Sequence, residues 1–416
     1  MKTKFIICLL SLTYSFPAIS QITLENCYQK AHDNYPLIKQ YDLIKKTGEF
    51  NLSNAAKGYL PQVSFSAKAS YQSEVTKIPV DIQGIDGLSK DQYGIVMEVG
   101  QTLWDGGAIK SKKEIIRSNS ETNRLNLEVN MYAIRERINQ LYFGALLIDE
   151  QLKQNDIYEN DLQKNLYKIS SYVKNGIANQ ADIDAVKVEL LKTVQNRVQL
   201  THSRKAYIEM LSSFIGERLE NKVILEKPSI PTTNKIVINR PELQWYDAQI
   251  RTYATQRLAL KADIMPKLGL FLTSGYGRPG LNMLDNNFKT YYIGGIKLSW
   301  NLSNLYTHKN SNRLINNQIN TVQSQKETFL LNTQMDVSQK ENMISSYKEQ
   351  LLYDDEIITL RKSVKQSSEA KIANGTLSGI DLVRDINAEN LALQDKSQHE
   401  IKMLFEIYNL KFTTNN

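Results

Sequence analysis

The 416-residue chain has few of the residues that build disulfide-stabilised or metal-stabilised folds. It contains two cysteines and four histidines. Cys8 falls within a predicted signal peptide, so the mature chain keeps Cys27 alone and cannot form an intrachain disulfide. The histidines are isolated and form no His-x-x-x-His pair or Cys–His cluster. We therefore expect no disulfide scaffold, no metal site and no cofactor.

Long hydrophobic runs are also missing. The most conspicuous apolar run of the mature chain, Gly144–Ile148, is far shorter than the roughly 20 residues that a membrane-spanning helix needs. Residues 1–20 combine two lysines, an apolar stretch and the small residues Ala18 and Ser20, which is the pattern of a removed Sec-type signal peptide. If this exported chain enters a membrane, we expect it to do so as a closed β-barrel.

Proline is scarce and unevenly placed. The chain has nine prolines, and none lies in residues 80–227 or 280–416. Because proline is the main helix breaker, these gaps predict long helices. The formal net charge is +7, but the basic residues are scattered among acidic ones. This distribution indicates a solvated surface rather than the basic stripe of a nucleic-acid-binding protein.

The chain has two halves with the same order of features. In each half, a helical stretch precedes two alternating segments, and a long helical stretch then runs to an Asn-Gly pair. The second alternating segment ends at Trp104 in the first half and at Trp300 in the second. This order predicts an internal structural duplication. The predicted parts are a signal peptide at 1–20, a first repeat at 21–216, a linker at 217–239 and a second repeat at 240–416.

Four segments of about ten residues alternate between apolar and polar side chains, which predicts strands near 61–71, 91–103, 266–276 and 290–300. In the least regular of them, we expect Tyr292, Ile296, Leu298 and Trp300 to point outward. Two ordinary hairpins packed on helices would explain the alternation too. Four strands cannot close a barrel alone, so a barrel requires several copies of the chain. The aromatic residues near the segment ends suit a membrane-interface girdle: Tyr59, Tyr71, Tyr93, Trp104, Tyr276, Tyr291 and Trp300.

Apolar residues with coiled-coil spacing follow each pair of strands. They recur in steps of three and four from Leu127 to Leu152, which predicts the seam of a coiled coil in a helix of about 100 Å. A return helix follows, and its expected apolar face consists of Ala185, Val186, Leu190, Val194 and Val198. The second half repeats the pattern. We thus expect two long helical hairpins, with turns near 174–182 and 373–381.

A search for catalytic motifs finds little. Gly275, Gly277 and Gly280 match a dinucleotide-binding pattern, but a strand and a loop surround them, and Pro279 would obstruct the start of a helix. We interpret this segment as a turn. No catalytic residue and no enzymatic activity are expected.

The two hairpin turns share one further feature. Asp182 and Asp381 each stand six residues after the glycine of an Asn-Gly pair. One interpretation is structural, with a helix cap followed by an acid that suits the next helix dipole. The other is a recognition tip whose acids form a charged ring when copies assemble around an axis.

In these features the chain resembles the TolC family of outer membrane efflux proteins. The motifs that carry the resemblance are Asn34–Pro36, Leu60-Pro61, the strand-to-helix junction from Leu103 to Gly107, and the two Asn-Gly turns with their aspartates. Each motif is weak alone, but together they occur in order, and most of them occur twice.

The resemblance implies an α+β membrane protein. Three protomers with four strands each would form one 12-stranded β-barrel in outer-membrane lipid, continuous with a long α-helical coiled-coil barrel in the periplasm. The hairpin ends would meet a periplasmic adaptor (membrane fusion) protein and an inner-membrane pump of the RND, ABC or MFS type. The implied aperture candidates are Asp381, Arg384, Asp385 and Asp182, and the implied adaptor-docking candidates are Asn175, Gly176, Asn374, Gly375 and Leu377.

The expected function is passive export through an outer membrane channel, serving either efflux of small molecules or type I secretion of proteins. No nucleic acid would take part. The alternative is a periplasmic coiled-coil adaptor or structural protein without a pore.

Overall fold

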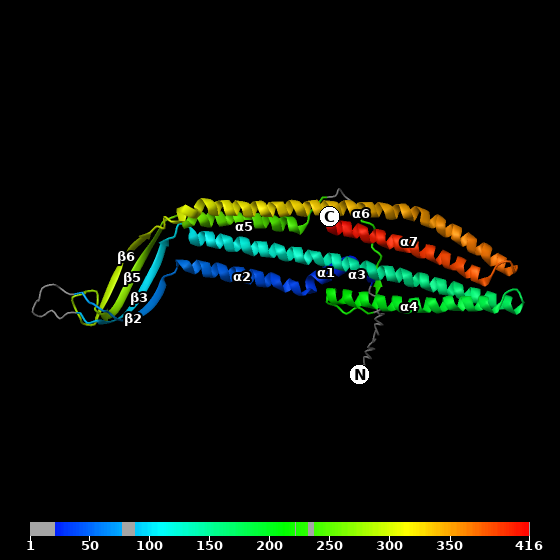
Figure 1. The fold of residues 1–416 in the computed structure, drawn as a ribbon, viewed down its shortest axis with the longest axis horizontal. Helices are drawn as coiled ribbons and strands as arrows, with labels where there is room; N and C mark the ends of the chain where they lie inside the picture. The colour runs from blue at the N-terminus through cyan, green and yellow to red at the C-terminus, as the bar shows by residue number, and fades with distance from the viewer. Residues whose placement is uncertain (1–20, 77–87, 221, 232–236, 416) are drawn as a thin grey trace, which may run out of the picture. The chain divides into compact units, whose positions relative to one another are not determined.

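The computed structural model describes residues 21–76, 88–220, 222–231 and 237–415 (Figure 1). The predicted signal peptide at 1–20 lies outside the described residues. The chain forms two compact units. One, here called the hairpin unit, consists of the described residues within Met1–Ile38, Asn130–Arg240 and Asn332–Asn416, and the other, the sheet unit, consists of those within Lys39–Val129 and Pro241–Leu331. Each unit draws on both predicted repeats, so a repeat is not a unit of packing.

The second half of the chain largely repeats the element order of the first: a helix, two strands, a long helix and a return helix. The elements of the first half are β1 (Gln21–Ile22), α1 (Leu24–Asn34), η1 (Pro36–Ile38), α2 (Lys39–Ala56), η2 (Lys57–Tyr59), β2 (Gln62–Tyr71), β3 (Asp91–Trp104), α3 (Ala108–Lys174), α4 (Gln180–Ile215) and β4 (Ile224–Leu225). Those of the second half are α5 (Pro241–Asp263), β5 (Lys267–Arg278), β6 (Lys289–Ser299), α6 (Asn304–Ala373) and α7 (Gly379–Thr414).

Four antiparallel strands form one sheet in the order β2-β3-β5-β6. Their bounds lie within two residues of the predicted strands, which are thereby confirmed. Pairing of β3 with β5, from Tyr93↔Arg278 to Trp104↔Leu268, joins the strands of the two halves in a single sheet. Strands β2 and β6 are its edges, and neither has a further strand beside it in the described part of the chain.

The strand register gives the sheet two different faces. The apolar face carries large side chains, and the predicted outward set in β6 belongs to it. The opposite face, here called the polar face, carries hydroxyl, amide and lysine side chains together with many glycines. The apolar members of the first face are Val63, Phe65, Ala67, Ala69, Tyr71, Tyr93, Ile95, Met97, Val99, Leu268, Leu270, Leu272, Tyr276, Tyr292, Ile296 and Leu298.

A β-bulge lies at the helix end of β3. Thr102 pairs with Gly269 and Trp104 with Leu268, so Leu103 has no register partner. Unbroken pairing would place Leu103 opposite Leu268. The extra residue instead brings the Trp104 ring into line with Leu268 on the apolar face.

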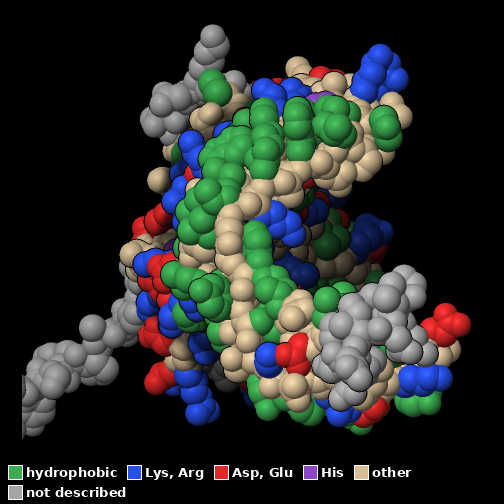
Figure 2. All heavy atoms as spheres, turned by 90° about the vertical axis from the view of Figure 1, so that its left-hand side faces the viewer, with side chains coloured by type: hydrophobic (Ala, Val, Ile, Leu, Met, Phe, Trp, Pro, Cys, Tyr) green, Lys and Arg blue, Asp and Glu red, His purple; other side chains and the backbone are tan. Residues whose placement is uncertain are grey.

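The polar face is lined by small residues. Gly94, Gly100, Gly269, Gly275, Gly277 and Gly295 all belong to it. Two of them lie beneath aromatic rings, because a Cβ on Gly275 would approach Tyr291 to 2.5 Å and one on Gly295 would approach Phe271 to 3.1 Å. Small residues on one face and bulky ones on the other suit a sheet that curves with the polar face inside. Figure 2 shows a curved band of hydrophobic side chains with backbone and other atoms on its inner side.

The junction between β3 and α3 is built by Asp105, Gly106 and Gly107. The Asp105 carboxylate accepts the Gly107 N–H at 2.9 Å and the Ile109 N–H at 2.6 Å, which satisfies the start of the helix. Gly106 has φ +69°, and a Cβ there would lie 2.4 Å from the Cβ of Met265. The chain can therefore turn here only with glycine.

The long helices of the hairpin unit have mixed polar and apolar contacts. None of the helices in the described residues has the length and hydropathy that a membrane-spanning helix requires. The predicted seam of α3 is buried at Met131, Ile138 and Ala145, as expected. The predicted apolar face of α4 is buried at Val186, as expected, but the prediction is wrong at Val194 and Val198, which are exposed.

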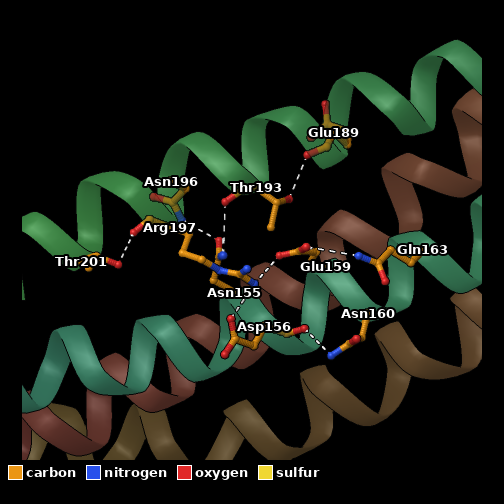
Figure 3. A network of polar contacts seen from close by, with 10 residues as sticks. All are labelled: Asn155, Asp156, Glu159, Asn160, Gln163, Glu189, Thr193, Asn196, Arg197 and Thr201. Carbon is orange, nitrogen blue, oxygen red and sulfur yellow. Dashed lines mark hydrogen bonds and ion pairs between the residues drawn. The ribbon is translucent and has the colours of Figure 1, made fainter. Parts of the chain in front are cut away.

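A polar network holds α3 against α4 (Figure 3). Arg197 on α4 donates to Asp156 at 2.7 Å and pairs with Glu159, both on α3. The buried Asn155 amide donates to the carbonyl of Thr193 at 3.2 Å. Hydrogen bonds between helices thus take the place of apolar contacts along this part of the hairpin, which explains why the apolar pattern was wrong at Val194 and Val198.

The linker between the repeats is tied into the hairpin unit. β4 lies within the predicted linker and pairs in parallel with β1. The Tyr142 hydroxyl lies 2.7 Å from the carbonyl oxygens of both Ile22 and Glu226, the residues at this pair. Cys27 is fully buried close by in the chain, and burial raises the pKa of its thiol to about 12.

Candidate functional site: the apolar sheet face and the hairpin ends

The apolar face of the sheet is exposed in the chain. Phe65, Ile296 and Leu298 each expose about 70% of their surface, and no helix covers this face in the described residues. This disagrees with the alternative in which the two hairpins pack on helices. An exposed apolar surface of this extent marks a site that contacts another molecule or a lipid phase.

Aromatic residues stand at both ends of this face. Tyr71, Tyr93 and Tyr276 lie at the end that carries the β2–β3 and β5–β6 connections, and Trp104 and Trp300 lie at the helix end. The Trp300 indole N–H donates to the carbonyl of Ile264 at 3.0 Å, while its ring stays exposed.

Two other girdle candidates differ in position. Tyr59 lies in η2, before β2 begins, with the Lys113 ammonium 5.8 Å from its ring centroid. Tyr291 pairs with Gly275 on the polar face and covers it, so the structure places this residue on the wrong face for the predicted girdle.

The turn between α3 and α4 is built around Gly176 in the left-handed conformation, with φ +76°. The Ile177 N–H donates to the carbonyl of Tyr172 at 2.9 Å, and the Gly176 N–H donates to that of Val173 at 3.1 Å. This is the pattern of a helix closed by a glycine. Asn179 and Asp182 then cap α4, each accepting the other's backbone N–H.

The turn between α6 and α7 uses the same elements at matching positions. Gly375 has φ +69°, and the Thr376 N–H donates to the carbonyl of Lys371 at 3.0 Å. Ser378 caps α7 by accepting the Asp381 N–H at 3.2 Å. The sequence prediction of two turns closed by Asn-Gly is confirmed.

Asp182 joins the two turns. Its carboxylate also accepts the backbone N–H of Gly379, the first residue of α7, at 2.6 Å. A Cβ on Gly379 would lie 2.5 Å from the Cβ of Asp182, so this approach requires glycine. Asp182 is 3% exposed. In the chain it acts as a buried cap between the hairpins, not as an exposed member of an acidic ring.

The remaining aperture candidates lie close together but differ in exposure. Arg384 exposes 73% of its side chain and lies 3.3 Å from the Asp381 carboxylate, which is 39% exposed. Asp385 is mostly buried and accepts a hydrogen bond from the Ser368 hydroxyl at 2.6 Å. Among the aperture candidates, the solvent-facing charges are therefore those of Asp381 and Arg384.

The docking candidates Asn175, Gly176, Asn374 and Gly375 are exposed at the turns, whereas Leu377 is partly buried against an apolar cluster. That cluster draws on all four helices of the two hairpins and holds them together. Its buried members are Tyr158, Leu162, Ile169, Val186, Ile372, Leu382, Val383 and Ile386.

Sequence reasoning did not identify two apolar side chains beside the turns. Ile177 is 42% exposed and Ile380 is 57% exposed. Ile177 directly follows the turn residue Gly176, and Ile380 lies between Ser378 and Asp381 at the start of α7. The turn pattern alone therefore does not reveal them. Their exposure, next to polar turns, gives the hairpin ends an apolar contact surface.

A lysine between two carboxylates also escaped the sequence analysis. Lys365 on α6 lies 2.7 Å from Asp161 on α3 and 2.5 Å from Glu389 on α7. Burial acts to lower the pKa of Lys365, but the hydrogen bonds to the two carboxylates outweigh it, and the pKa is raised. The ammonium thus stays charged and links three helices. Nothing in the local sequence distinguishes Lys365 from its exposed neighbours.

Comparison with solved structures gives one consistent result. The chain matches the outer-membrane channel OprN with a TM-score of 0.71 at 14% identity, over 94% of this chain and 89% of that one. It matches the MtrE outer membrane channel of Neisseria gonorrhoeae with a TM-score of 0.71 at 11% identity, over 94% and 89%. The outer membrane protein VceC of Vibrio cholerae matches with a TM-score of 0.68 at 11% identity, over 94% of both chains.

The chain has the fold of the outer-membrane channels. The resemblance predicted from sequence is confirmed at the level of the fold. No protein-family model and no curated protein matches the sequence. The similarity to these channels is therefore a similarity of fold.

Proposed function

We propose that the protein is the outer-membrane duct of a tripartite export system. Three copies, each giving four strands, form a 12-stranded barrel. The observation that carries the proposal is the exposed apolar face on a sheet with two unpaired edges. A four-stranded sheet cannot satisfy its own edges in lipid, and only closure with other copies removes them.

The height of the apolar face supports a lipid-facing role. Trp104 pairs with Leu268 and Tyr93 pairs with Arg278, so the two aromatic ends stand ten residues apart along β5. At about 3.3 Å per residue this is about 33 Å, which a strand tilt of about 40° reduces to about 25 Å. An apolar band of about that height, between aromatic girdles, is typical of outer-membrane barrels.

The helices would then lie in the periplasm, with the hairpin ends directed toward the inner membrane. The exposed Ile177 and Ile380, together with Asn175 and Asn374, provide a surface for an adaptor protein. An inner-membrane pump of the RND, ABC or MFS type supplies the energy, and the duct itself is passive. Asp381 and Arg384 are the aperture charges of this proposal.

The test places charge on one face of the sheet at a time. Phe65→Asp and Leu270→Asp put a carboxylate on the apolar face, and we expect both variants to lose outer-membrane assembly. Ser66→Asp, on the polar face next to Phe65, is the matched control and should assemble as a trimer in the outer-membrane fraction. Recovery of the unmodified protein as a soluble periplasmic monomer would contradict the proposal and favour an adaptor without a pore.

A second test addresses the aperture. Asp381→Ala should change the conductance or its block by divalent cations in planar bilayers, because it removes an exposed carboxylate at the turn. Unchanged conductance across pH and divalent-cation titrations would remove Asp381 from the aperture but would leave the duct proposal intact.

A further inference from the structure

The polar face of the sheet carries an excess of positive charge. Lys68, Lys267 and Lys297 belong to this face by register and are exposed. Within the described residues, none of the three has an ion-pair partner. Lys289 lies on the same face but pairs with Asp285. Its charge is therefore locally compensated.

Acidic residues do not balance these lysines. Glu98 is the one acid among the described strand residues of the polar face. Asp91, at the end of β3, lies on the other face and pairs with Arg278. Three uncompensated lysines against one glutamate leave two positive charges on the polar face of each chain.

The lysines stand at different levels along the strands. Lys68 lies level with Gly94 and Gly277 near the turn end, whereas Lys297 pairs with Gly269 near the helix end. Lys68 and Lys297 pair with glycines and Lys267 pairs with Ser299, so each lysine has a small residue as its register partner. Copies related by an axis would place each lysine in a ring at its own level.

The polar face is hollowed at its helix end. A groove of about 930 Å³ runs along it, and among its lining residues are Ser64, Glu98, Thr273, Lys267 and Lys297. The other acid that borders this groove is Asp105, which is 7% exposed and holds the start of α3 through two backbone N–H groups. Because Asp105 is buried and these N–H groups hold its carboxylate, the exposed charges of the groove are those of Lys267, Lys297 and Glu98.

We propose that the inside of the barrel favours anions, so that the exported solutes are anionic or carry exposed acidic groups. The inference rests on the proposed function, because only closure of the sheet turns the polar face into a lumen. Three copies place six uncompensated positive charges around that lumen. Rings of lysine attract anions and repel cations, and low-dielectric walls concentrate the field along the path.

The test is the reversal potential of the full-length protein in planar bilayers under a KCl gradient. We expect the unmodified channel to pass chloride in preference to potassium. The triple variant Lys68→Gln/Lys267→Gln/Lys297→Gln should lower the chloride-to-potassium permeability ratio. Each kT of local potential changes that ratio about sevenfold, so a loss of one kT predicts a fall of about sevenfold.

Three comparisons keep the test specific. The matching Lys→Arg triple variant keeps the charge and should keep the permeability ratio. Glu98→Gln removes the opposing charge on the same face and should raise the ratio. For the unmodified channel, the ratio should move toward 1 as salt rises from about 0.1 M to about 1 M, because the Debye length falls from about 10 Å to about 3 Å.

The outcomes separate this inference from the duct proposal. A protein that forms no ion-conducting pore contradicts the duct itself. A conducting pore that prefers potassium, or whose permeability ratio is the same in the Gln and Arg triple variants, overturns the anion preference alone. If the triple Gln variant fails to assemble but Glu98→Gln assembles, the permeability ratio of Glu98→Gln decides. A rise in that ratio supports the inference, and a fall or no change overturns it.

Discussion

Removal of the Asp182 carboxylate should loosen the contact between the two hairpin ends. Asp182→Ala deletes the acceptor for the N–H groups of Asn179 at 3.0 Å and Gly379 at 2.6 Å. Loss of an N-terminal cap costs about 0.5–2 kcal/mol, and loss of a hydrogen bond to a charged group costs about 1.5–3 kcal/mol. The Asn179 bond lies within the first hairpin, so we expect the contact between the hairpins to lose about 1.5–3 kcal/mol through the Gly379 bond.

Hydrogen–deuterium exchange of the first turns of α7 measures this loss directly. A local opening that is easier by about 1.5–3 kcal/mol speeds exchange by about 10-fold to 140-fold, since about 1.4 kcal/mol corresponds to a factor of ten. Peptides that cover residues 379–386 report it in the purified full-length protein. Asp182→Asn should accelerate exchange by an intermediate factor. The amide oxygen can still accept one of the two backbone N–H groups, but the amide NH2 would face the other N–H and cannot accept it.

Asp381→Ala is the matched control for this prediction. Asp381 stands at the equivalent position of the second hairpin, but it lies at the surface, and its carboxylate receives a hydrogen bond from the Ser378 hydroxyl and pairs with the exposed Arg384. Exposed pairs contribute about 0–1 kcal/mol, so exchange should rise by no more than about fivefold. Equal acceleration in the two variants would refute the reasoning that Asp182 bridges the hairpins.

Three further predictions concern the hairpin unit. Lys365→Met leaves two carboxylates without their ammonium and should lower the free energy of unfolding in urea by about 1–3 kcal/mol, with partial recovery in Lys365→Arg. Burial raises the pKa of the Glu406 carboxyl above its ordinary value of 4.5. The protonated carboxyl therefore contributes stability below pH 4.5, and this contribution is lost as the pH rises through the folded-state pKa. Glu406→Gln should flatten this part of the pH–stability curve. Cys27, with its thiol pKa raised to about 12, should react with maleimide at mildly alkaline pH only after unfolding, and labelling of the folded protein would contradict its burial.

The strands and turns were predictable because they depend on local chemistry. Period-2 alternation gave the four strands. The turn glycines Gly176 and Gly375 adopt the left-handed conformation that closes a helix, which any L side chain disfavours. These features need only neighbouring residues, so one sequence is enough to find them.

Most of the missed features depend on residues that are distant in sequence. Pairing of β3 with β5 and of β1 with β4 joins segments far apart, and no local pattern records such pairs. The bulge at Leu103 appears only when β3 is aligned with β5. The carboxylates around Lys365 come from two other helices. Sequence periodicity identifies which face of an element is apolar, but not which polar groups meet across elements.

The two hairpin ends show how similar segments acquire different roles. Asn179 and Ser378 cap equivalent helices, and Asp182 and Asp381 stand three residues later in each. The difference lies one residue after the cap, where the first hairpin has Gln180 and the second has Gly379. Because Gly379 has no side chain, its backbone N–H can approach the Asp182 carboxylate and close a contact that Gln180 could not offer in return. One aspartate is thereby buried between the hairpins while its counterpart stays at the surface beside Arg384, so only the second hairpin is left with an exposed acid at this position.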